Sequence, residues 1–427
     1  MLISLIIALL LAQILLRVPV AFAIAFSGIV GIWWLNDLDV VIGVLGVSLA
    51  SAAGSYSLSA IPLFILMAQL VLASGVLGEL FESAKVIVGR TRGGTGMAAI
   101  GAGSMFAAVS GSSTAAAATL AHTSSSQMIA QGYSPRLAAG LVAVTGTLAA
   151  MVPPSILLVF YAITAEQSVG KVLVAGFVPG FLVAVSLLAT LFILIRLNPS
   201  LAPSGERFSW AEKIIGLKVM APVIFLFATV VGTIYFGLAT PTEAAALGCL
   251  GGLIIMAVRR KLNLDNIRQA LLSTTSSSVM ILFIIIGAHV FGHFLVETQA
   301  TPRMIEAIGQ LPVSPFFIML MIVLLYIVLG FFMDQIAIIA LTVPIVVPLI
   351  ISLGYDPIWF GVLVILLAEI GLITPPLGLN VFVVARSSNL SVEEVFKGVI
   401  PFVLAVLFVA LLILILPEIV LFVPNSM

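Results

Sequence analysis

The sequence predicts an all-α polytopic membrane protein with two inverted repeats of about five spans each, two re-entrant helical hairpins and two proline-broken helices. Three observations support this fold class. The 427 residues are 62% hydrophobic and only 8% charged. Their mean hydropathy of +1.33 lies far outside the range of soluble domains. Two apolar segments with adjacent prolines, VPPSILLVF and TPPLGLNVF, stand 222 positions apart.

Composition also excludes several classes of protein. Seventeen basic and seventeen acidic residues cancel, so no basic surface for nucleic acid is expected, and the single cysteine allows no intrachain disulfide. Since a span needs about 20 apolar residues, the chain has room for roughly ten crossings. When spans are counted, the basic clusters fall on one side, apart from Lys171 and Arg303. The positive-inside rule makes that side the cytoplasm.

Apolar runs between short polar stretches define the elements of the first half. In order they are spans at 2–16 and 20–35, an amphipathic stretch near 40–56, a span at about 60–76, a re-entrant hairpin at about 97–130, a broken span at 137–165 and a span at 171–195. We expect segment 2–16 to be a membrane span and not a cleaved signal peptide, with its N-terminus outside, because no basic residue precedes its apolar run.

The second half repeats this order after a polar segment. Its elements are spans at 217–237 and 241–258, an amphipathic stretch at 262–270, a span at 272–295, a hairpin at 312–352, a broken span at 357–386 and a span at 398–416.

A tandem repeat underlies that order. At an offset of 222, QGYSPRLAAGLV (131–142) aligns with LGYDPIWFGVLV (353–364), and PPSILLVF aligns with PPLGLNVF with five of eight residues identical. Each half contains an odd number of crossings, so the repeats are inverted. Inverted repeats with interrupted helices are typical of secondary transporters, whose site lies near the midplane.

The double prolines at 153–154 and 375–376 each interrupt a helix inside the membrane. They leave carbonyls without helical partners, and in hydrocarbon such groups need other partners. Unwound carbonyls of this kind coordinate Na⁺ in transporters. The carbonyls are those of Ala149, Ala150, Gly371 and Leu372. The candidate side chains nearby are the hydroxyls of Thr145, Thr147, Ser155 and Thr374 and the amide of Asn380, which could face a substrate. The alternative is a pair of packing kinks.

Each hairpin has a polar or glycine-containing tip. In the first, residues 110–114 (SGSST) interrupt an apolar run; in the second, Gly330 and Asp334 stand at the equivalent turn. Helices that begin at such tips point positive dipole ends at an anionic substrate without any arginine. The alternative for the first tip is tight helix packing between small residues.

Acidic and histidine residues at membrane depth are further candidates. Asp334 is either functional or the cap of the next helix. We expect Glu369 to tie the broken helix together by hydrogen bonds, with a direct coupling role as the alternative. His289, His293 and Glu297 follow metal-ligand spacing, but a polar packing or interface stripe is favoured. No G-x-x-x-x-G-K-[ST] motif is present, which argues against ATP hydrolysis.

Several motifs resemble those of one transporter family from end to end. They are AIPLFILMAQL (60–70), FAAVSGSS (106–113), GYSP (132–135), VPPSILLVFYAIT (152–164), GKVLVAGFVPG (170–180), ATPTEAAA (239–246), FMDQIAIIALTVPIVVP (332–348) and DPIWFGVLVILLAEIGLITPPLGLNVFVV (356–384). Through them the chain resembles the large membrane subunit of tripartite ATP-independent periplasmic (TRAP) transporters, the DctM-like family of the ion transporter superfamily.

The resemblance implies a function and an architecture. It implies a Na⁺-driven importer of small organic acids (carboxylates) in the inner membrane of a bacterium or archaeon, with no organic cofactor and no enzyme activity. It implies a small four-helix membrane subunit (DctQ-like) and a periplasmic substrate-binding protein (DctP-like) as partners, and an elevator mechanism. The corresponding parts are scaffold 1–96, transport part 97–197, cytoplasmic linker 198–216, scaffold 217–311 and transport part 312–427.

The resemblance also implies the site residues. The first sodium site would use Ser110, Gly111, Ser112, Ser113, Thr145, Gly146, Pro153 and Ser155, and the second would use Gly330, Met333, Asp334, Gly371, Thr374 and Leu377. The substrate would meet Ser112, Ser113, Thr374 and Asn380. One departure is that the family's first hairpin often continues with an aspartate, whereas SGSSTAAAA has none.

Three other functions remain as alternatives. The nearest is a stand-alone Na⁺-coupled carboxylate symporter that needs no binding protein. More distant are a channel that uses the helix breaks as a filter, and a membrane-embedded enzyme that uses Asp334, Glu369 or the His289–His293–Glu297 stripe. Neither of these explains the inverted repeat as well.

Overall fold

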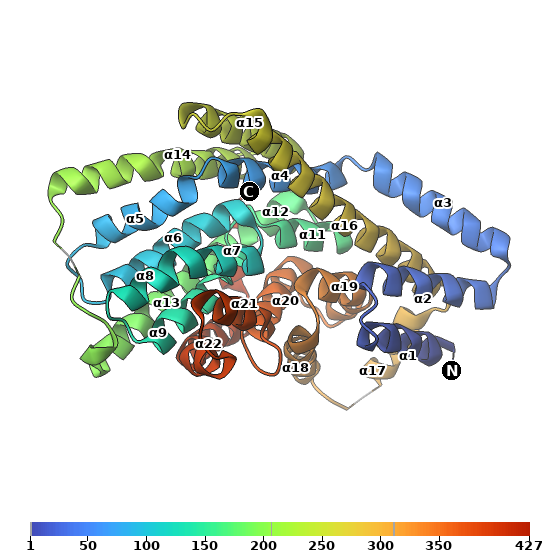
Figure 1. The fold of residues 1–427 in the computed structure, drawn as a ribbon. Helices are drawn as coiled ribbons and strands as arrows, with labels where there is room; N and C mark the ends of the chain where they lie inside the picture. Colours follow the sequence, from blue (N-terminus) through green and yellow to red (C-terminus); the bar gives the residue numbers. More distant parts are fainter. Residues whose placement is uncertain (1, 206, 311) are drawn as a thin grey trace.

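The computed structural model describes residues 2–205, 207–310 and 312–427, apart from the side chains of 15, 77 and 107–110. Within these ranges every regular element is helical, which confirms the predicted all-α class. The helices form one elongated body in which the two halves of the chain lie against each other (Figure 1).

The helices of the first half follow the predicted order. They are α1 Leu2–Leu15, α2 Val20–Leu35, α3 Leu38–Gly54, α4 Ala60–Ala73, α5 Val76–Val88, α6 Gly94–Ser110, α7 Ser113–Leu120, a π-helical turn at Ala121–Ser125, α8 Ser126–Ala130, α9 Pro135–Thr145, α10 Leu148–Met151, α11 Ile156–Thr164, α12 Val169–Ala175 and α13 Phe177–Leu197.

The second half has fewer and longer helices. They are α14 Trp210–Tyr235, α15 Pro241–Val258, α16 Leu264–Glu297, α17 Ala300–Gly309, α18 Pro315–Phe332, α19 Gln335–Ser352, α20 Pro357–Leu372, α21 Leu379–Ser388, α22 Val392–Ile415 and α23 Glu418–Leu421.

Helix bounds recur at the spacing found in the sequence. The first hairpin, α6 to α8, covers 94–130, and the second, α18 and α19, covers 315–352. The helices after the breaks begin at Ile156 and Leu379, and short α5 has its counterpart in α17. The inverted orientation of the repeats remains a prediction that rests on the span count.

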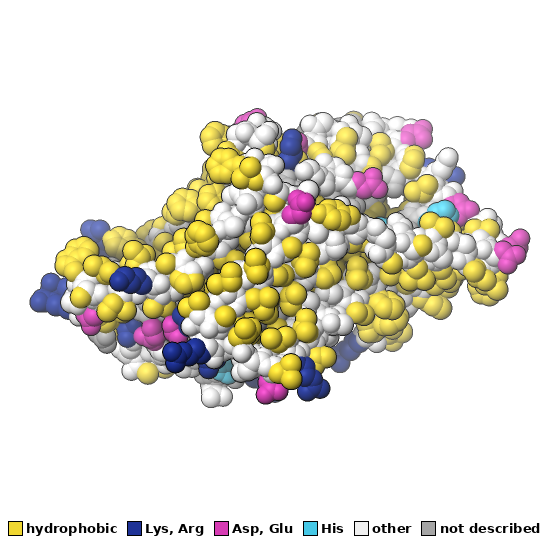
Figure 2. Space-filling model, turned by 90° about the horizontal axis from the view of Figure 1, so that it is seen from above, with side chains coloured by type: hydrophobic (Ala, Val, Ile, Leu, Met, Phe, Trp, Pro, Cys, Tyr) yellow, Lys and Arg dark blue, Asp and Glu magenta, His cyan; other side chains and the backbone are white. Residues whose placement is uncertain are grey.

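The length and apolarity of the helices fit a multi-pass membrane protein. Among the described residues, seven helices are long and apolar enough to cross a membrane, and nine segments qualify if each bent helix pair counts as one span. The helices α1, α2 and α20 are apolar but shorter. In Figure 2 the hydrophobic side chains cover most of the visible face, while Lys and Arg gather mainly toward the left end.

Two predicted boundaries are wrong. The linker predicted at 198–216 ends earlier, because α14 begins at Trp210. There the Ser209 side chain accepts from the Glu212 backbone N–H, and Glu212 accepts from the Ser209 backbone N–H, which together form a capping box. The segments predicted separately at 262–270 and 272–295 form one helix, α16. Its hydroxyl-rich run does not interrupt it, since Thr274 bonds back to the Ala270 carbonyl.

Close packing of small residues joins the two halves on the scaffold side. A Cβ at Gly28 of α2 would lie 2.8 Å from the Phe291 backbone nitrogen of α16, and a Cβ at Gly252 of α15 would lie 3.0 Å from the Leu70 Cβ of α4. The pairs α2–α16 and α4–α15 therefore pack at short backbone distances, as is typical of membrane helices. Each pair takes one helix from each half of the chain.

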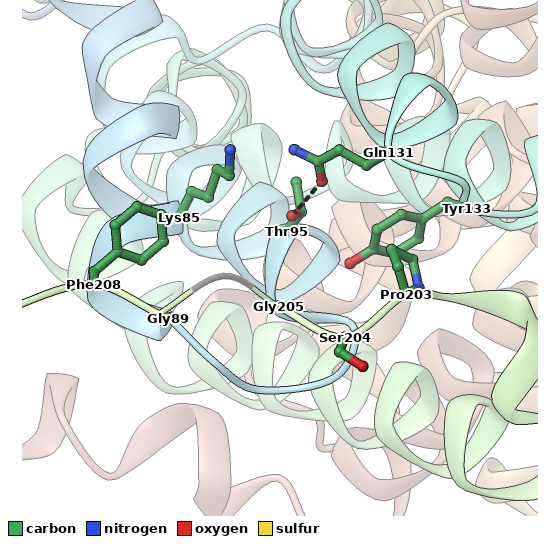
Figure 3. A pocket seen from close by; sticks show the side chains of 9 residues that line it. All are labelled: Lys85, Gly89, Thr95, Gln131, Tyr133, Pro203, Ser204, Gly205 and Phe208. Atoms are coloured by element: carbon green, nitrogen blue, oxygen red, sulfur yellow. Dashed lines mark hydrogen bonds between the residues drawn. The ribbon is translucent and has the colours of Figure 1, made fainter.

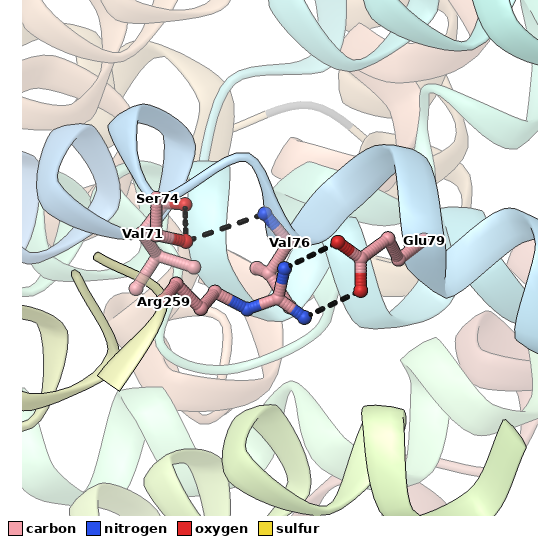
Figure 4. A network of polar contacts seen from close by, with 5 residues as sticks. All are labelled: Val71, Ser74, Val76, Glu79 and Arg259. Atoms are coloured by element: carbon pink, nitrogen blue, oxygen red, sulfur yellow. Dashed lines mark hydrogen bonds and ion pairs between the residues drawn. The ribbon is translucent and has the colours of Figure 1, made fainter. Parts of the chain in front are cut away.

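One ion pair fastens the same scaffold at the side predicted to be cytoplasmic. Arg259, at the end of α15, donates to both carboxylate oxygens of Glu79 in α5, at 2.6 and 2.7 Å (Figure 4). The hydrogen bond from Arg259 lowers the pKa of Glu79. The Ser74 hydroxyl donates to the Val71 carbonyl, and its oxygen accepts from Val76 N–H where the chain turns from α4 into α5. The ion pair links α5 to the end of α15, while the Ser74 bonds fix the turn between α4 and α5.

The segments predicted to form the transport part are joined by an even closer contact between α9 and α22. A Cβ at Gly398 of α22 would lie 2.0 Å from the Arg136 carbonyl oxygen, and a Cβ at Gly140 of α9 would lie 2.3 Å from the Gly398 carbonyl carbon. Neither position has room for a methyl group. Glycine at both positions therefore lets a helix of the first half dock on the last long helix of the second half.

We expect Gly140→Ala to destabilise the protein by about 1–3 kcal/mol, because the added methyl group overpacks the α9–α22 contact. The measurement is the thermal unfolding midpoint of the purified chain in detergent. Gly232→Ala in α14 is the matched control, since a Cβ there would meet nothing within 4 Å. Equal midpoints for the two variants would contradict the packing argument.

Candidate functional site

The tip of the first hairpin is a sharp turn between two helices. α6 ends at Ser110, whose side chain lies outside the described part of the chain. Gly111 has φ +57°, and a Cβ on it would lie 2.9 Å from the Ile156 side chain. Ser112 is extended and caps α7 by accepting from Ala115 N–H at 3.5 Å. The tip therefore rests directly on the start of α11.

The first helix break lies against this tip. The α9 helix ends at Thr145, and α11 begins at Ile156 after a cis Pro153–Pro154 bond. A Cβ at Gly146 would lie 2.9 Å from the Ser113 carbonyl oxygen. The Thr145 hydroxyl donates to the Leu141 carbonyl at 2.8 Å, while buried Ser155 caps α11. The structure thus brings part of the predicted first site together, since Gly111 lies against the start of α11, which Ser155 caps, and Gly146 lies against Ser113.

The tip of the second hairpin is capped by a carboxylate. Met333 is extended between α18 and α19. Asp334 Oδ1 accepts from the backbone N–H groups of Ile336 at 2.8 Å and Ala337 at 3.2 Å. Asp334 therefore does cap the helix that follows it, which was one of the two roles considered for it. The cap uses one carboxylate oxygen.

The second break lies against the second tip. α20 ends at Leu372 and α21 begins at Leu379 after a cis Pro375–Pro376 bond. A Cβ at Gly371 would lie 2.4 Å from Gly330 Cα, so break and tip meet backbone to backbone. The Gly371 carbonyl, predicted to lack a helical partner, instead accepts from Thr374 N–H at 3.3 Å. Leu377, another residue predicted for the second sodium site, lies between α20 and α21 and is 41% exposed. A tight turn replaces the bond that Pro375 cannot make.

A buried polar network joins the two tips. Glu369 of α20 is fully buried, and its Oε2 accepts from the Ser113 hydroxyl at 2.7 Å. Its Oε1 accepts from Gln335 Nε2. Asn380 of α21, also fully buried, donates from Nδ2 to Ser113 Oγ at 2.8 Å, while its Oδ1 has no hydrogen-bond partner among the described residues. Among the described residues the Glu369 carboxylate bonds to the two tips and reaches α21 only through Ser113 and Asn380, so the expected direct tie across the broken helix is not found.

A cavity of about 220 Å³ lies between these tips and the scaffold. Ser112, Ile156 and Gln335 line it from the starts of α7, α11 and α19, and Gln69 of α4 and Ser277 of α16 line it from the scaffold. Asn380 and Thr374 do not line this cavity. Among its described lining residues none is charged.

Two further cavities lie nearer the ends of the molecule. One of about 210 Å³ lies between α5, the base of the first hairpin and the polar linker, where Thr95 donates to Gln131 at 2.7 Å (Figure 3). The other, of about 600 Å³, is lined by His289, His293 and Glu166. The third member of the histidine stripe, Glu297, turns away and accepts from Asn36 at 2.5 Å.

The comparison with known families decides the identity. Residues 7–419 match the family described as "Tripartite ATP-independent periplasmic transporter, DctM component". The chain belongs to this family. As a DctM-family chain it is a transporter permease and not an enzyme, in agreement with the sequence prediction.

Individual relatives agree with this assignment. The chain is 33% identical over 382 residues to a C4-dicarboxylate TRAP transporter large permease protein of Pseudomonas aeruginosa, which covers 89% of each chain. It is 31% identical to a sialic acid TRAP transporter permease protein of Haemophilus influenzae, over 87% of this chain and 60% of that protein. Among solved structures, the YdaH transporter of Alcanivorax borkumensis has a similar fold, with a TM-score of 0.65, 16% identity and 90% coverage of both chains.

Sequence reasoning missed several residues of this DctM-family site. Gln69 lies in the AIPLFILMAQL motif but nothing in that motif singles it out, and Ser277 stands in α16 outside the quoted motifs, so the packing of α4 and α16 against the tips identifies them. Gln335 could have been predicted from the sequence, because it follows Ser113 by the same 222 positions that relate the proline pairs. A search for polar residues at both ends of that spacing would have found it.

We expect Asp334→Ala to lower the stability of the DctM-family chain by about 1 kcal/mol, because α19 loses its cap. Asp334→Asn should retain most of the stability, since its amide oxygen can accept the same two N–H bonds. Thermal unfolding in Na⁺-free buffer measures both variants. If Asp334→Asn destabilised as strongly as Asp334→Ala, the charge of Asp334 and not its capping bonds would be what matters.

Proposed function

We propose that this DctM-family chain is the large permease subunit of a Na⁺-driven TRAP importer of small carboxylates. It would work by an elevator mechanism in the inner membrane of a bacterium or archaeon. Its partners would be a small four-helix membrane subunit and a periplasmic substrate-binding protein. The observation that carries the proposal is the uncharged cavity of about 220 Å³ on which the starts of three helices converge.

The caps of these three helices favour an anionic substrate on one side of the cavity. Ser112 and Ser155, which cap α7 and α11, are neutral, so the positive ends of these helix dipoles are not offset by a side-chain charge. α19, by contrast, is capped by the carboxylate of Asp334. A substrate carboxylate is therefore favoured at α7 and α11. The relatives named for C4-dicarboxylates and for sialic acid both take carboxylates as substrates.

The acidic residues favour a cation close to the tips and breaks. Glu369 is fully buried, and within the described residues no Lys or Arg forms an ion pair with it or with Asp334. A buried carboxylate without a basic partner is costly unless another positive charge is nearby. Oxygen atoms of Thr145, Ser155 and the broken helices are the ligands that Na⁺ prefers. This supports Na⁺ at the two tip-and-break regions.

The packing supports movement of the tips and breaks as one body. Each tip contacts its own break through glycine, at Gly146 and at the Gly330–Gly371 pair, and the Glu369 network joins the two tips. The helices α2, α4, α15 and α16 pack mainly on one another, and α4 and α16 line the other side of the cavity. The stand-alone symporter alternative would share this geometry. It differs in that the purified chain would transport without partner proteins.

We expect substrate uptake into vesicles that hold this chain, its small subunit and its binding protein to require an inward Na⁺ gradient. Radiolabelled C4-dicarboxylates and sialic acid are the substrates to try first. Replacement of Na⁺ by K⁺ should abolish accumulation. Unchanged uptake in K⁺ would refute sodium coupling, and uptake by the chain alone would favour the stand-alone symporter.

We expect Ser112→Ala and Thr374→Ala to raise the Na⁺ concentration for half-maximal uptake by about tenfold, because each removes an oxygen from a tip or break. Thr229→Ala in α14 is the matched control for Thr374. The Thr229 hydroxyl donates to the carbonyl four residues earlier at 2.8 Å, as that of Thr374 does. Expression and thermal stability are measured in parallel. Equal loss of expression and uptake would favour a packing role for these residues.

A further inference from the structure

The carboxylate of Glu369 has two oxygens that face two different hairpins. Oε2 accepts from the Ser113 hydroxyl at the first tip, at 2.7 Å, and Oε1 accepts from the Gln335 amide at the second tip. Ser113 is the first residue of α7, and Gln335 is the first residue of α19. The tips are therefore joined through one side chain that belongs to neither hairpin.

The two donors occupy equivalent positions of the repeat. Gln335 follows Ser113 by 222 positions, the spacing that separates the two proline pairs. The carboxylate has no such duplicate, because the position equivalent to Glu369 in the first half is Thr147, whose hydroxyl donates to the Val144 carbonyl at 2.7 Å. A single acceptor thus serves both repeats.

The chemistry of this arrangement rests on the two oxygens of the Glu369 side chain. Both act as acceptors, so one side chain holds one donor from each hairpin at the same time. Asn380 adds the second broken helix, since its Nδ2 donates to Ser113 Oγ at 2.8 Å. Loss of the carboxylate would leave buried donors on two elements without an acceptor.

We propose that Glu369 is a positioning residue that locks the two hairpin tips to each other, so that a change at one tip is transmitted to the other. Any site formed by the first tip is then coupled energetically to any site formed by the second, and the coupling is reciprocal. The link itself does not depend on which ion or substrate the tips bind.

The test measures how accessible the first hairpin tip is to a reagent when a residue of the second tip is substituted. Ala115 is exposed at the start of α7 and lines the central cavity, and Cys249, the only cysteine, is buried. The full chain carrying Ala115→Cys is labelled with a small maleimide in Na⁺-free vesicles. We expect Gln335→Met, which removes the donor on the other hairpin, to speed labelling about tenfold. Gln127→Met is the matched control, because Gln127 is exposed and lies on the probed hairpin itself, and it should leave the rate unchanged.

A second substitution shows whether Glu369 carries the effect. Glu369→Met removes both acceptor oxygens at similar volume, and in that background Gln335→Met should add little to the labelling rate. The proposal is overturned if Gln335→Met labels at the parent rate, or if its effect is unchanged in Glu369→Met. Should Glu369→Met fail to fold, Ser113→Ala is combined with Ile336→Cys, where faster labelling than in Ile336→Cys alone is expected and an unchanged rate would overturn the proposal. Because Na⁺ is absent, failure of this test is distinct from failure of sodium coupling.

Discussion

The absence of water inside a bilayer is the constraint on which this structure depends. Every backbone group that a helix break or hairpin tip exposes must be satisfied within the protein. At the four interruptions, local contacts satisfy such groups. Ser112, Ser155 and Asp334 cap the helices that start there, and the Thr374 N–H donates to the Gly371 carbonyl. Each tip also packs on its own break, and the two tips are joined through Glu369. The central cavity lies between these tips and the helices α4 and α16.

The sequence predicted those features that depend on local chemistry. Double prolines marked both breaks, because two adjacent prolines interrupt a helix, and the serine and glycine tip marked the first hairpin, because these residues form helices less readily than the apolar run around them. It failed where a local signal was overlooked or absent. The Ser209–Glu212 capping box could be recognised in the sequence, and it would have placed the end of the linker correctly. Nothing local predicts that Ser113 and Gln335 share one acceptor, since their contact with Glu369 spans 256 and 34 positions.

The two repeats share a fold but divide its charges unequally. The second half supplies Asp334, Glu369 and Asn380, whereas the equivalent positions in the first half are Ser112, Thr147 and Leu158. The aspartate that the family often places after the first tip is also absent. Both acidic side chains at the tips and breaks therefore come from the second repeat, while the neutral serine caps come from the first.

This inequality would give the two parts of the proposed site different charge preferences. An anion would be favoured at the uncompensated ends of α7 and α11, and a cation would be favoured near the carboxylates at the start of α19 and in α20. A symmetric pair of repeats would present the same field to both charges and could not separate them. Since Glu369 also bonds to Ser113, this buried carboxylate is attached to the neutral tip, although it does not itself line the cavity. A cation that settles beside Glu369 therefore acts on the same residue that orients the start of α7. The divergence of the repeats thus supplies a physical route by which ion and substrate sites can influence each other.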